Sequence, residues 1–206
     1  MSGTVIDGRT TFMNDQRRGY VVLTVNTLAF MICFAAWMMN GVLITYLVDN
    51  DVYQWDKAQM GWLIGVPVLT GAVARLPMGI LTDRYGGRIV FGLLLLISSV
   101  PMFLVSFADS YLQFLLTGLG FGLTGASFAV GIAYTSVWFS PERQGTALGI
   151  FGAGNAGAAL TAMGAPFVLR LLTDNGANLE GWRTLPQLYA GALVITGILF
   201  FLLTCC

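Results

Sequence analysis

The residues GAVARLPMGILTDRYGGR, Gly71–Arg88, join an arginine inside an apolar run to a charged, glycine-rich turn, and they set the architecture expected for the whole chain. The apolar run covers residues 58–81 and is long enough to cross a bilayer. Arg75 lies inside it. On insertion scales an arginine near the bilayer centre costs about 2.5 to 3.5 kcal/mol, so it normally faces the interior of a helix bundle and marks a substrate or ion path. The stretch therefore predicts a membrane helix that carries a ligand-binding arginine.

Small residues share a helical face with this arginine. Residues on one face of a helix recur three or four positions apart, and here they are Gly61, Gly65, Val68, Ala72, Arg75 and Gly79. Small residues let membrane helices approach closely. The alternative is that Arg75 snorkels to the membrane surface or pairs with a carbonyl group, but it lies about 12 Å from Asp83 along the helix, a long reach for its side chain. The pattern favours binding of a ligand.

The second part of the stretch, from Gly79 onward, has the form of a tight turn at the membrane face. Gly86 and Gly87 permit the backbone conformations that such a reversal needs. The charged residues around them can form ion pairs, or they can simply solvate a loop. We expect a conformational-switch loop, formed by Gly79, Asp83, Arg84, Gly87 and Arg88.

Composition excludes several classes of protein. Of the 206 residues, 56% are hydrophobic and 10% are charged, whereas about a quarter of the residues in a soluble domain are charged. The net charge is zero and there is no histidine, so a nucleic-acid partner, which requires a basic face, is not expected. We find no nucleophile with a base and no ligand cluster, which argues against an enzyme, a metal site or a cofactor. The lipid bilayer is the expected partner.

The three cysteines do not change this interpretation. Cys33, Cys205 and Cys206 are too few, and too apolar in setting, for a disulfide framework or a metal site. The terminal pair directly follows an apolar run, so we interpret it as a helix end rather than a lipidation signal.

Apolar runs predict an all-α membrane protein with six transmembrane helices. We expect helices at approximately 20–48, 58–81, 89–107, 111–139, 146–172 and 187–206. Residues 1–19 form a polar, cytoplasmic N-terminal tail, and residues 20–206 form one six-helix bundle. Both termini are predicted to be cytoplasmic, because basic residues concentrate on the inner side of membrane proteins. Six basic residues are predicted inside, Arg9, Arg17, Arg18, Arg84, Arg88 and Arg143, and three outside, Lys57, Arg170 and Arg183.

The first predicted helix carries an aromatic stripe, with Phe30, Phe34 and Trp37 on one face. Such a stripe can line a cavity or pack between helices, and packing is the commoner role.

The predicted helix 146–172 holds a second candidate site. Gly149, Ala153 and Gly157 recur four residues apart and predict a face for close helix approach. Asn155 is the one amide of this helix, and in hydrocarbon it needs a partner, either another helix or a substrate. It lies about 15 Å from Gly145 along the helix, a depth close to that of the buried arginine. We expect both polar residues near mid-membrane.

Two motifs resemble the nitrate/nitrite porter family, a branch of the major facilitator superfamily. The turn ending at Arg88 has the spacing of the superfamily's loop between helices 2 and 3, and FSPERQGTALGIFGAGNAG, Phe139–Gly157, resembles the family's nitrate signature. The resemblance extends over the whole chain as the N-terminal half of a twelve-helix transporter. It implies six helices arranged as two inverted three-helix repeats, in which the second and fifth helices are partners.

The resemblance also implies a binding site. Arg75 would be the arginine that binds the anion, and Asn155, with Gly154 and Gly157, would lie in the signature at the site. The segment 125–129, GASFA, is similar to a family segment whose phenylalanine stacks on the planar anion, which implies Phe128 as a further contact. We expect Arg75 and Asn155 within roughly 10 Å of each other, the spacing of packed helices, in one groove bordered by Phe128 and open toward the missing helices.

The implied function is secondary active transport of nitrate, nitrite or both across the cytoplasmic (inner) membrane by alternating access, for nitrate assimilation. Its partners would be the anion, the bilayer and a C-terminal six-helix half that supplies a second binding arginine. The predicted helices contain no interior Asp, Glu or His, so this half offers no proton relay and leaves antiport and proton symport open. The alternatives are a transporter of another small anion or an organic acid, or a half-transporter that is inactive alone.

Overall fold

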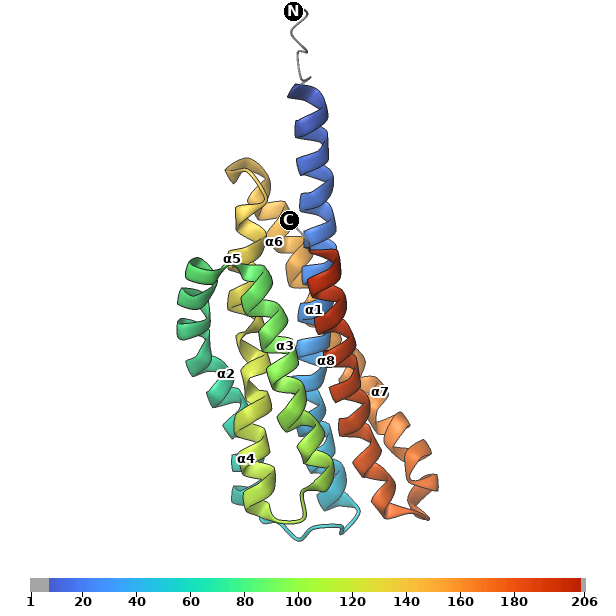
Figure 1. Ribbon diagram of the computed structural model, residues 1–206. Helices are drawn as coiled ribbons and strands as arrows, with labels where there is room; N and C mark the ends of the chain where they lie inside the picture. The colour runs from blue at the N-terminus through green and yellow to red at the C-terminus, as the bar shows by residue number, and fades with distance from the viewer. Residues whose placement is uncertain (1–7, 205–206) are drawn as a thin grey trace, which may run out of the picture.

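The computed structural model describes residues 8–204, and within them every regular element is a helix (Figure 1). The α-helices are α1 (Gly8–Asp49), α2 (Lys57–Tyr85), α3 (Gly87–Leu104), α4 (Tyr111–Phe121), α5 (Ser127–Val137), α6 (Pro141–Gly152), α7 (Ala156–Leu172) and α8 (Thr184–Leu203). The short 3₁₀ segments are η1 (Val105–Phe107), η2 (Gly122–Ala126), η3 (Ala153–Asn155), η4 (Asp174–Gly176) and η5 (Leu179–Arg183).

Six helical segments of the described chain are long and apolar enough to cross a membrane. Two of them join two α-helices through a 3₁₀ segment: α4, η2 and α5 form one segment, and α6, η3 and α7 form another. The segments are Arg18–Asp49, Lys57–Tyr85, Gly87–Phe107, Tyr111–Val137, Pro141–Leu172 and Leu179–Leu203. This confirms the prediction of an all-α protein with six transmembrane helices.

Several helix ends differ from the predicted bounds: α6 begins at Pro141 rather than at 146, and α8 begins at Thr184 rather than at 187. The first helix begins at Gly8, so most of the predicted polar tail is helical, and α1 projects beyond the bundle (Figure 1). The charged turn is shorter than predicted because α2 continues to Tyr85 and α3 begins at Gly87. Only Gly86 separates the two helices. Its φ is 82°, a backbone conformation that residues other than glycine rarely adopt. The C-terminal cysteine pair lies outside the described residues.

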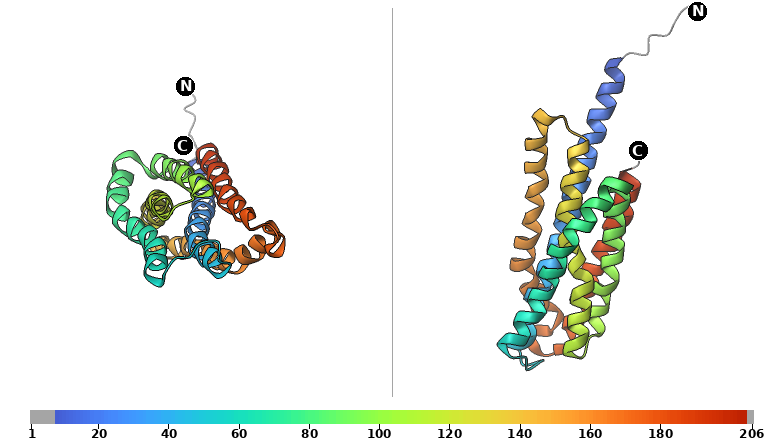
Figure 2. Two further views of the ribbon diagram at one scale, coloured as in Figure 1. Left: turned by 90° about the horizontal axis from the view of Figure 1, so that it is seen from below. Right: turned by 90° about the vertical axis from the view of Figure 1, so that its left-hand side faces the viewer.

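The first helix occupies the middle of the bundle. It packs against α5, α7 and α8, while α2 packs against α4, η2 and α5, and α3 packs against α8. Viewed along the bundle, α2 and α7 lie on opposite sides, with α1 and the α4–α5 segment between them (Figure 2).

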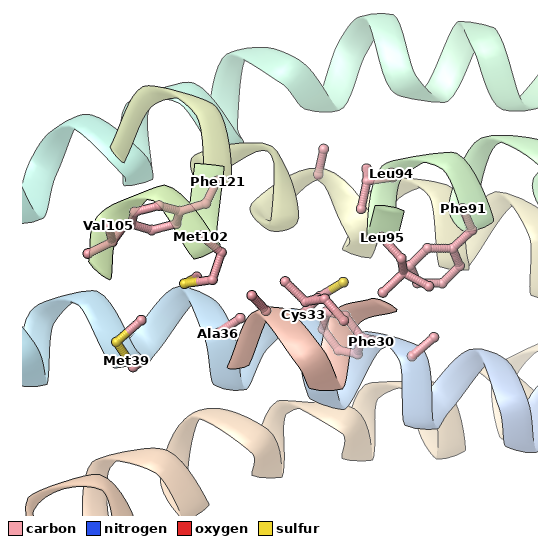
Figure 3. Packing of buried hydrophobic residues seen from close by; sticks show 14 of the residues in the cluster. Phe30, Cys33, Ala36, Met39, Phe91, Leu94, Leu95, Met102, Val105 and Phe121 are labelled. Atoms are coloured by element: carbon pink, nitrogen blue, oxygen red, sulfur yellow. The ribbon is translucent and has the colours of Figure 1, made fainter. Parts of the chain in front are cut away.

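The core consists of apolar side chains that α1 directs toward α3 and α4. Phe30, Cys33, Ala36 and Met39 recur every three residues along α1 and are buried against a layer that includes Phe121 (Figure 3). Lipid tails are as apolar as these side chains, so burial alone gives little driving force in a membrane and close van der Waals contact matters more.

Glycines provide such contact between α3 and α8. A Cβ on Gly92 would lie 2.4 Å from the ring of Phe201, and one on Gly197 would lie 2.9 Å from Cδ2 of Leu96. Neither position has space for a larger residue.

At the end of the bundle away from the two termini, which we call the far end, Arg183 joins several loops. Its guanidinium pairs with Asp109 at 2.6 Å and with Glu180 at 2.5 Å, and it donates to the carbonyl oxygen of Ser106 at 2.9 Å. The hydroxyl of Tyr53, from the loop after α1, donates to the carbonyl oxygen of Ala108 at 3.3 Å. The far ends of α1, α3 and α8 are thereby tied together.

Candidate functional site

The guanidinium of Arg75 lies against the middle of the α4–α5 segment. Its Nε donates to the carbonyl oxygen of Gly125 at 3.4 Å, a long hydrogen bond, and its Cζ lies 5.9 Å from the centre of the Phe128 ring. The residue is exposed, and within the described residues it has no acidic partner. Arg75 therefore keeps donors that have no partner within the described residues, and its depth in the membrane stays a prediction.

Three glycines place Arg75 at this position. A Cβ on Gly71 would lie 2.9 Å from the carbonyl oxygen of Gly122 and 3.0 Å from the Cα of Gly125. A Cβ on Gly122 would lie 2.7 Å from the carbonyl oxygen of Pro67. The backbones of α2 and η2 are thus in contact, and Arg75 follows Gly71 by one helical turn, which brings its side chain to η2. This glycine contact was not predicted, because a glycine's partner depends on which helices meet.

Phe128 connects this arginine to the helix that carries Asn155. Its ring centre lies 5.5 Å from that of Phe30 and 6.1 Å from that of Phe151 on α6. Phe30 and Phe151 are fully buried and stack on each other at 4.7 Å. Phe128 itself is only partly buried, and one of its neighbours is a cation. It is the member of this aromatic cluster that borders the open side near Arg75.

The aromatic stripe on α1 packs between helices, which is one of the two roles considered for it. Phe30 is packed in the core, whereas Phe34 and Trp37 are partly buried. The ring centres of Phe30 and Phe34 are 4.7 Å apart, and those of Phe34 and Trp37 are 5.2 Å apart. Two ring carbons of Trp37 lie 3.5 Å from the position that a Cβ on Gly125 would take. Its indole Nε1 is buried and has no acceptor within the described residues. Trp37 thus lies at the same glycine as Arg75, a relation that the sequence did not predict.

Asn155 ends η3 and is exposed. Its Nδ2 donates to the carbonyl oxygen of Gly152 at 3.0 Å, three residues earlier in the same segment. Within the described residues no hydrogen bond joins this amide to another helix, which was one of its two expected roles. The side-chain oxygen of Asn155 is therefore free to meet a partner outside this half.

Gly154 and Gly157 face α1 rather than the open side. Both are buried: a Cβ on Gly154 would lie 2.9 Å from the carbonyl oxygen of Thr27, and one on Gly157 would lie 2.0 Å from that of Met31. They bring α1 and the α6–α7 segment into backbone contact. Their contribution to a site is to fix the position of Asn155, which lies between them in the sequence.

The predicted contact face of Gly149, Ala153 and Gly157 is wrong in two of its three members. No atom lies within 4 Å of a Cβ built on Gly149, and Ala153 is exposed. The reason is η3, because a 3₁₀ segment has three residues per turn and rotates the following face relative to a continuous α-helix. The contact face is formed by Gly154 and Gly157, three residues apart.

The predicted switch loop divides into a packed part and an open part. Gly87 is buried, and a Cβ on it would lie 2.2 Å from Cγ of Tyr134. Arg88 donates through Nη2 to the carbonyl oxygen of Phe201 at 2.8 Å and so caps the last turn of α8. These two residues fix α3 against α5 and α8.

The open part of this loop precedes the turn. Asp83 and Arg84 are exposed, and no ion pair within the described residues involves them. No atom lies within 4 Å of a Cβ built on Gly79. These residues are available to a partner that is not part of this chain, as a switch between two halves requires, and their role stays a prediction.

Chemically, the arrangement suits a small planar anion. A guanidinium presents donors in a plane that matches two oxygens of such an anion, and an aromatic ring offers a flat, apolar surface beside it. Arg75 and Phe128 provide both groups at one place. That Asn155 lies within roughly 10 Å of Arg75, in one groove, remains a prediction.

Comparison with known proteins gives a family match over most of the chain. The model of the Major Facilitator Superfamily matches residues 27–204. The "Probable nitrate/nitrite antiporter NarK1" of Thermus thermophilus is 43% identical over 184 residues, which are 87% of this chain and 41% of that protein.

Two further relatives align over a similar part. The "Nitrite extrusion protein" of Bacillus subtilis is 29% identical over 185 residues, 90% of this chain and 44% of that protein. The "Probable nitrate transporter NarT" of Staphylococcus haemolyticus is 31% identical over 185 residues, 90% of this chain and 46% of that protein. The chain thus spans less than half the length of these curated relatives, and it matches their N-terminal half.

Proposed function

The chain belongs to the Major Facilitator Superfamily, and from this premise we propose that it is the N-terminal half of a secondary active transporter of nitrate, nitrite or both. The observation that carries the proposal is the position of Arg75: a guanidinium with free donors, beside the Phe128 ring, within a membrane-spanning segment. An arginine within a membrane-spanning segment is costly, and such residues commonly mark a substrate or ion path. The names of the relatives identify nitrate and nitrite as the anions to test.

In this proposal the anion replaces the long hydrogen bond to Gly125 as the partner of Arg75. The guanidinium binds two anion oxygens in its plane, and Phe128 packs on the face of the anion. Asn155 approaches from the opposite wall of the groove, where Gly154 and Gly157 hold its helix against α1. A second half closes the groove and supplies further donors.

The exposed faces of this half support a partner of that kind. Leu76 on α2 is 74% exposed and Met163 on α7 is 82% exposed, and the small residues Gly61, Gly65 and Gly149 have open space where a Cβ would be. Open small-residue faces on two helices permit close packing by other helices. Alternating access then consists of rocking the two halves about the bound anion, with α2 and the α6–α7 segment as partners in the inverted repeats.

The proposed orientation puts both termini in the cytoplasm and the protein in the cytoplasmic membrane. Arg84, Arg88 and Arg143 lie at the end of the bundle nearer the termini, and the basic-residue bias assigns this end to the inside. The far end then faces outward.

A chimera in which residues 1–206 replace the corresponding half of the Thermus thermophilus relative tests substrate choice. Because a ligand that binds only the folded state raises its stability, nitrate or nitrite should raise the melting temperature of the purified chimera in a concentration-dependent way. Acetate and chloride at equal ionic strength are the comparison anions. Stabilisation by acetate but not by nitrate would favour the alternative of an organic-acid transporter.

Coupling is tested separately. The described membrane segments place their acidic residues at helix ends rather than at mid-membrane, and exchange of one anion for another needs no proton relay. We therefore propose exchange, with proton symport as the alternative. Nitrate uptake driven by internal nitrite should persist when an uncoupler is added, and its collapse would establish symport.

A further inference from the structure

A large cleft separates α1 from α7 in the half of the bundle toward the far end. The two segments are in contact at Gly154 and Gly157, and beyond that level α7 diverges from α1 (Figure 1). The cleft between them has a volume of about 830 Å³. The residues used below are among its lining: Met38, Gly41, Thr45, Asp49, Ile64 and Arg170.

Two opposite charges line this cleft without pairing. Arg170, in the last turn of α7, and Asp49, at the end of α1, are both exposed. Within the described residues neither side chain takes part in an ion pair or a hydrogen bond. Arg170 is the one cation among the lining residues of the cleft. Its planar donors are therefore available to an oxyanion.

The cleft leads along α1 toward the candidate site. Asp49, Thr45, Gly41 and Met38 recur three or four residues apart and so lie on one face of the helix. Met38 is adjacent in sequence to Trp37, which packs at the same glycine as Arg75. From Asp49 to this level the path is about 18 Å along the helix. Ile64 contributes α2 to the opposite wall.

We propose that this cleft is the outer vestibule of the anion path and that Arg170 is the first residue to bind the anion. The inference rests on the proposed function. Asp49 acts as a competitor through its charge: it lies in the same cleft, and its carboxylate lowers the positive potential that Arg170 presents to the anion. This competition shortens the residence time of the anion at Arg170. A transport pathway requires short residence, because each of its sites must release the anion as well as bind it.

The first test measures the local potential on the 206-residue chain itself, in liposomes. Thr45→Cys is introduced in a background with Cys33→Ala, Cys205→Ser and Cys206→Ser. Its rates of reaction with an anionic and a cationic methanethiosulfonate reagent are compared. For a unit charge several ångströms away in water, Arg170→Gln should lower the anionic-to-cationic rate ratio about tenfold, and Asp49→Asn should raise it by a similar factor.

Arg143→Gln, an exposed arginine at the other end of the bundle, is the matched control and should leave the ratio unchanged. An unchanged ratio in Arg170→Gln would overturn the proposal, as would equal changes in Arg170→Gln and Arg143→Gln.

The second test uses nitrate. Nitrate, against gluconate at equal ionic strength, should slow reaction of the anionic reagent in the parent and not in Arg170→Gln. Equal slowing in both, or no slowing in the parent, would contradict a binding role for Arg170.

Transport separates this inference from the proposed function. In the chimera described above, Arg170→Gln should raise the KM for nitrate several-fold and leave kcat unchanged. If the parent chimera transports nitrate and Arg170→Gln has the same KM, only the vestibule proposal fails. If Thr45→Cys becomes unreactive in the chimera, helices of the second half fill the cleft and the proposal also fails. A parent chimera without nitrate transport would instead contradict the proposed function.

Discussion

Single residues decide what this half can bind. Arg75 has five N–H donors in a rigid plane, and its one hydrogen bond within the described residues is the long contact to Gly125. Lysine at the same place would keep the charge, but its ammonium group is a compact point charge. It has no planar pair of N–H donors that could match two oxygens of the anion. The distinction between charge and shape can therefore be tested at one position.

We predict that Arg75→Lys lowers the nitrate affinity of the chimera at least tenfold, about 1.4 kcal/mol, while membrane insertion is retained. Affinity is measured from the nitrate dependence of the melting temperature. Arg84→Lys is the control, because Arg84 is exposed and unpaired within the described residues, and it should bind nitrate normally. Unchanged affinity in Arg75→Lys would remove this residue from the site.

At the scale of single residues, the sequence indicated which residues are candidates for the site but not which residues they contact. An arginine in an apolar run has few explanations, so Arg75 could be singled out, and the motif resemblance added Phe128. The contact of Arg75 with Gly125 and the buried indole N–H of Trp37 could not be predicted, since both depend on which residue of another helix lies at the same level.

Helices contact one another at glycines in this bundle. Short 3₁₀ segments within the helices determine which glycines form these contacts. The number of helices and their approximate ends followed from apolar length, because backbone groups in lipid must be satisfied within the helix. The 3₁₀ segment η3 was not predictable in the same way, since glycine and alanine accept either helix type. It changed the contact face from the predicted four-residue spacing to Gly154 and Gly157.

We predict opposite outcomes for two glycine substitutions in this segment. Gly157→Ala places a methyl group 2.0 Å from the carbonyl oxygen of Met31, so α1 and α7 must separate, at a cost of about 1 to 3 kcal/mol or more. Gly149→Ala meets no atom within 4 Å and should be neutral or slightly stabilising. Melting temperatures in detergent give the comparison. Equal melting temperatures for the two variants would contradict the contact described here.

The loops at the far end offer a prediction about pH. Burial raises the pKa of the Tyr53 hydroxyl, with the charges around Arg183 as smaller influences. A raised pKa means that the folded state favours the protonated hydroxyl, so this stabilisation is complete below the unfolded pKa of about 10 and is lost as pH rises through the folded value. Between about pH 8 and pH 11 the parent should therefore lose more melting temperature than Tyr53→Phe. If the melting temperatures of the parent and of Tyr53→Phe fell in parallel with pH, the pKa of Tyr53 would be the same in the folded and unfolded states.

For the whole molecule, the proposed function depends on faces of the bundle that are exposed and open to a partner. Residues 8–204 form a bundle whose α2 and α7 faces are exposed, and the chain matches less than half of each relative's length. In the proposed function, one chain displays half of a binding site, and alternating access requires a second six-helix body. The sequence allowed the six membrane segments to be predicted from apolar length, whereas the contacts that α2 makes with η2 became visible only in the structure.

Uptake of isotopically labelled nitrate into proteoliposomes loaded with nitrite tests the central claim most directly. The chimera with residues 1–206 should take up nitrate, and the chimera with Arg75→Lys should be strongly impaired at equal protein incorporation. The 206-residue chain alone should give only background uptake. Nitrate uptake at an equal rate by the parent and Arg75→Lys chimeras, or no uptake by a correctly inserted parent chimera, would contradict the account.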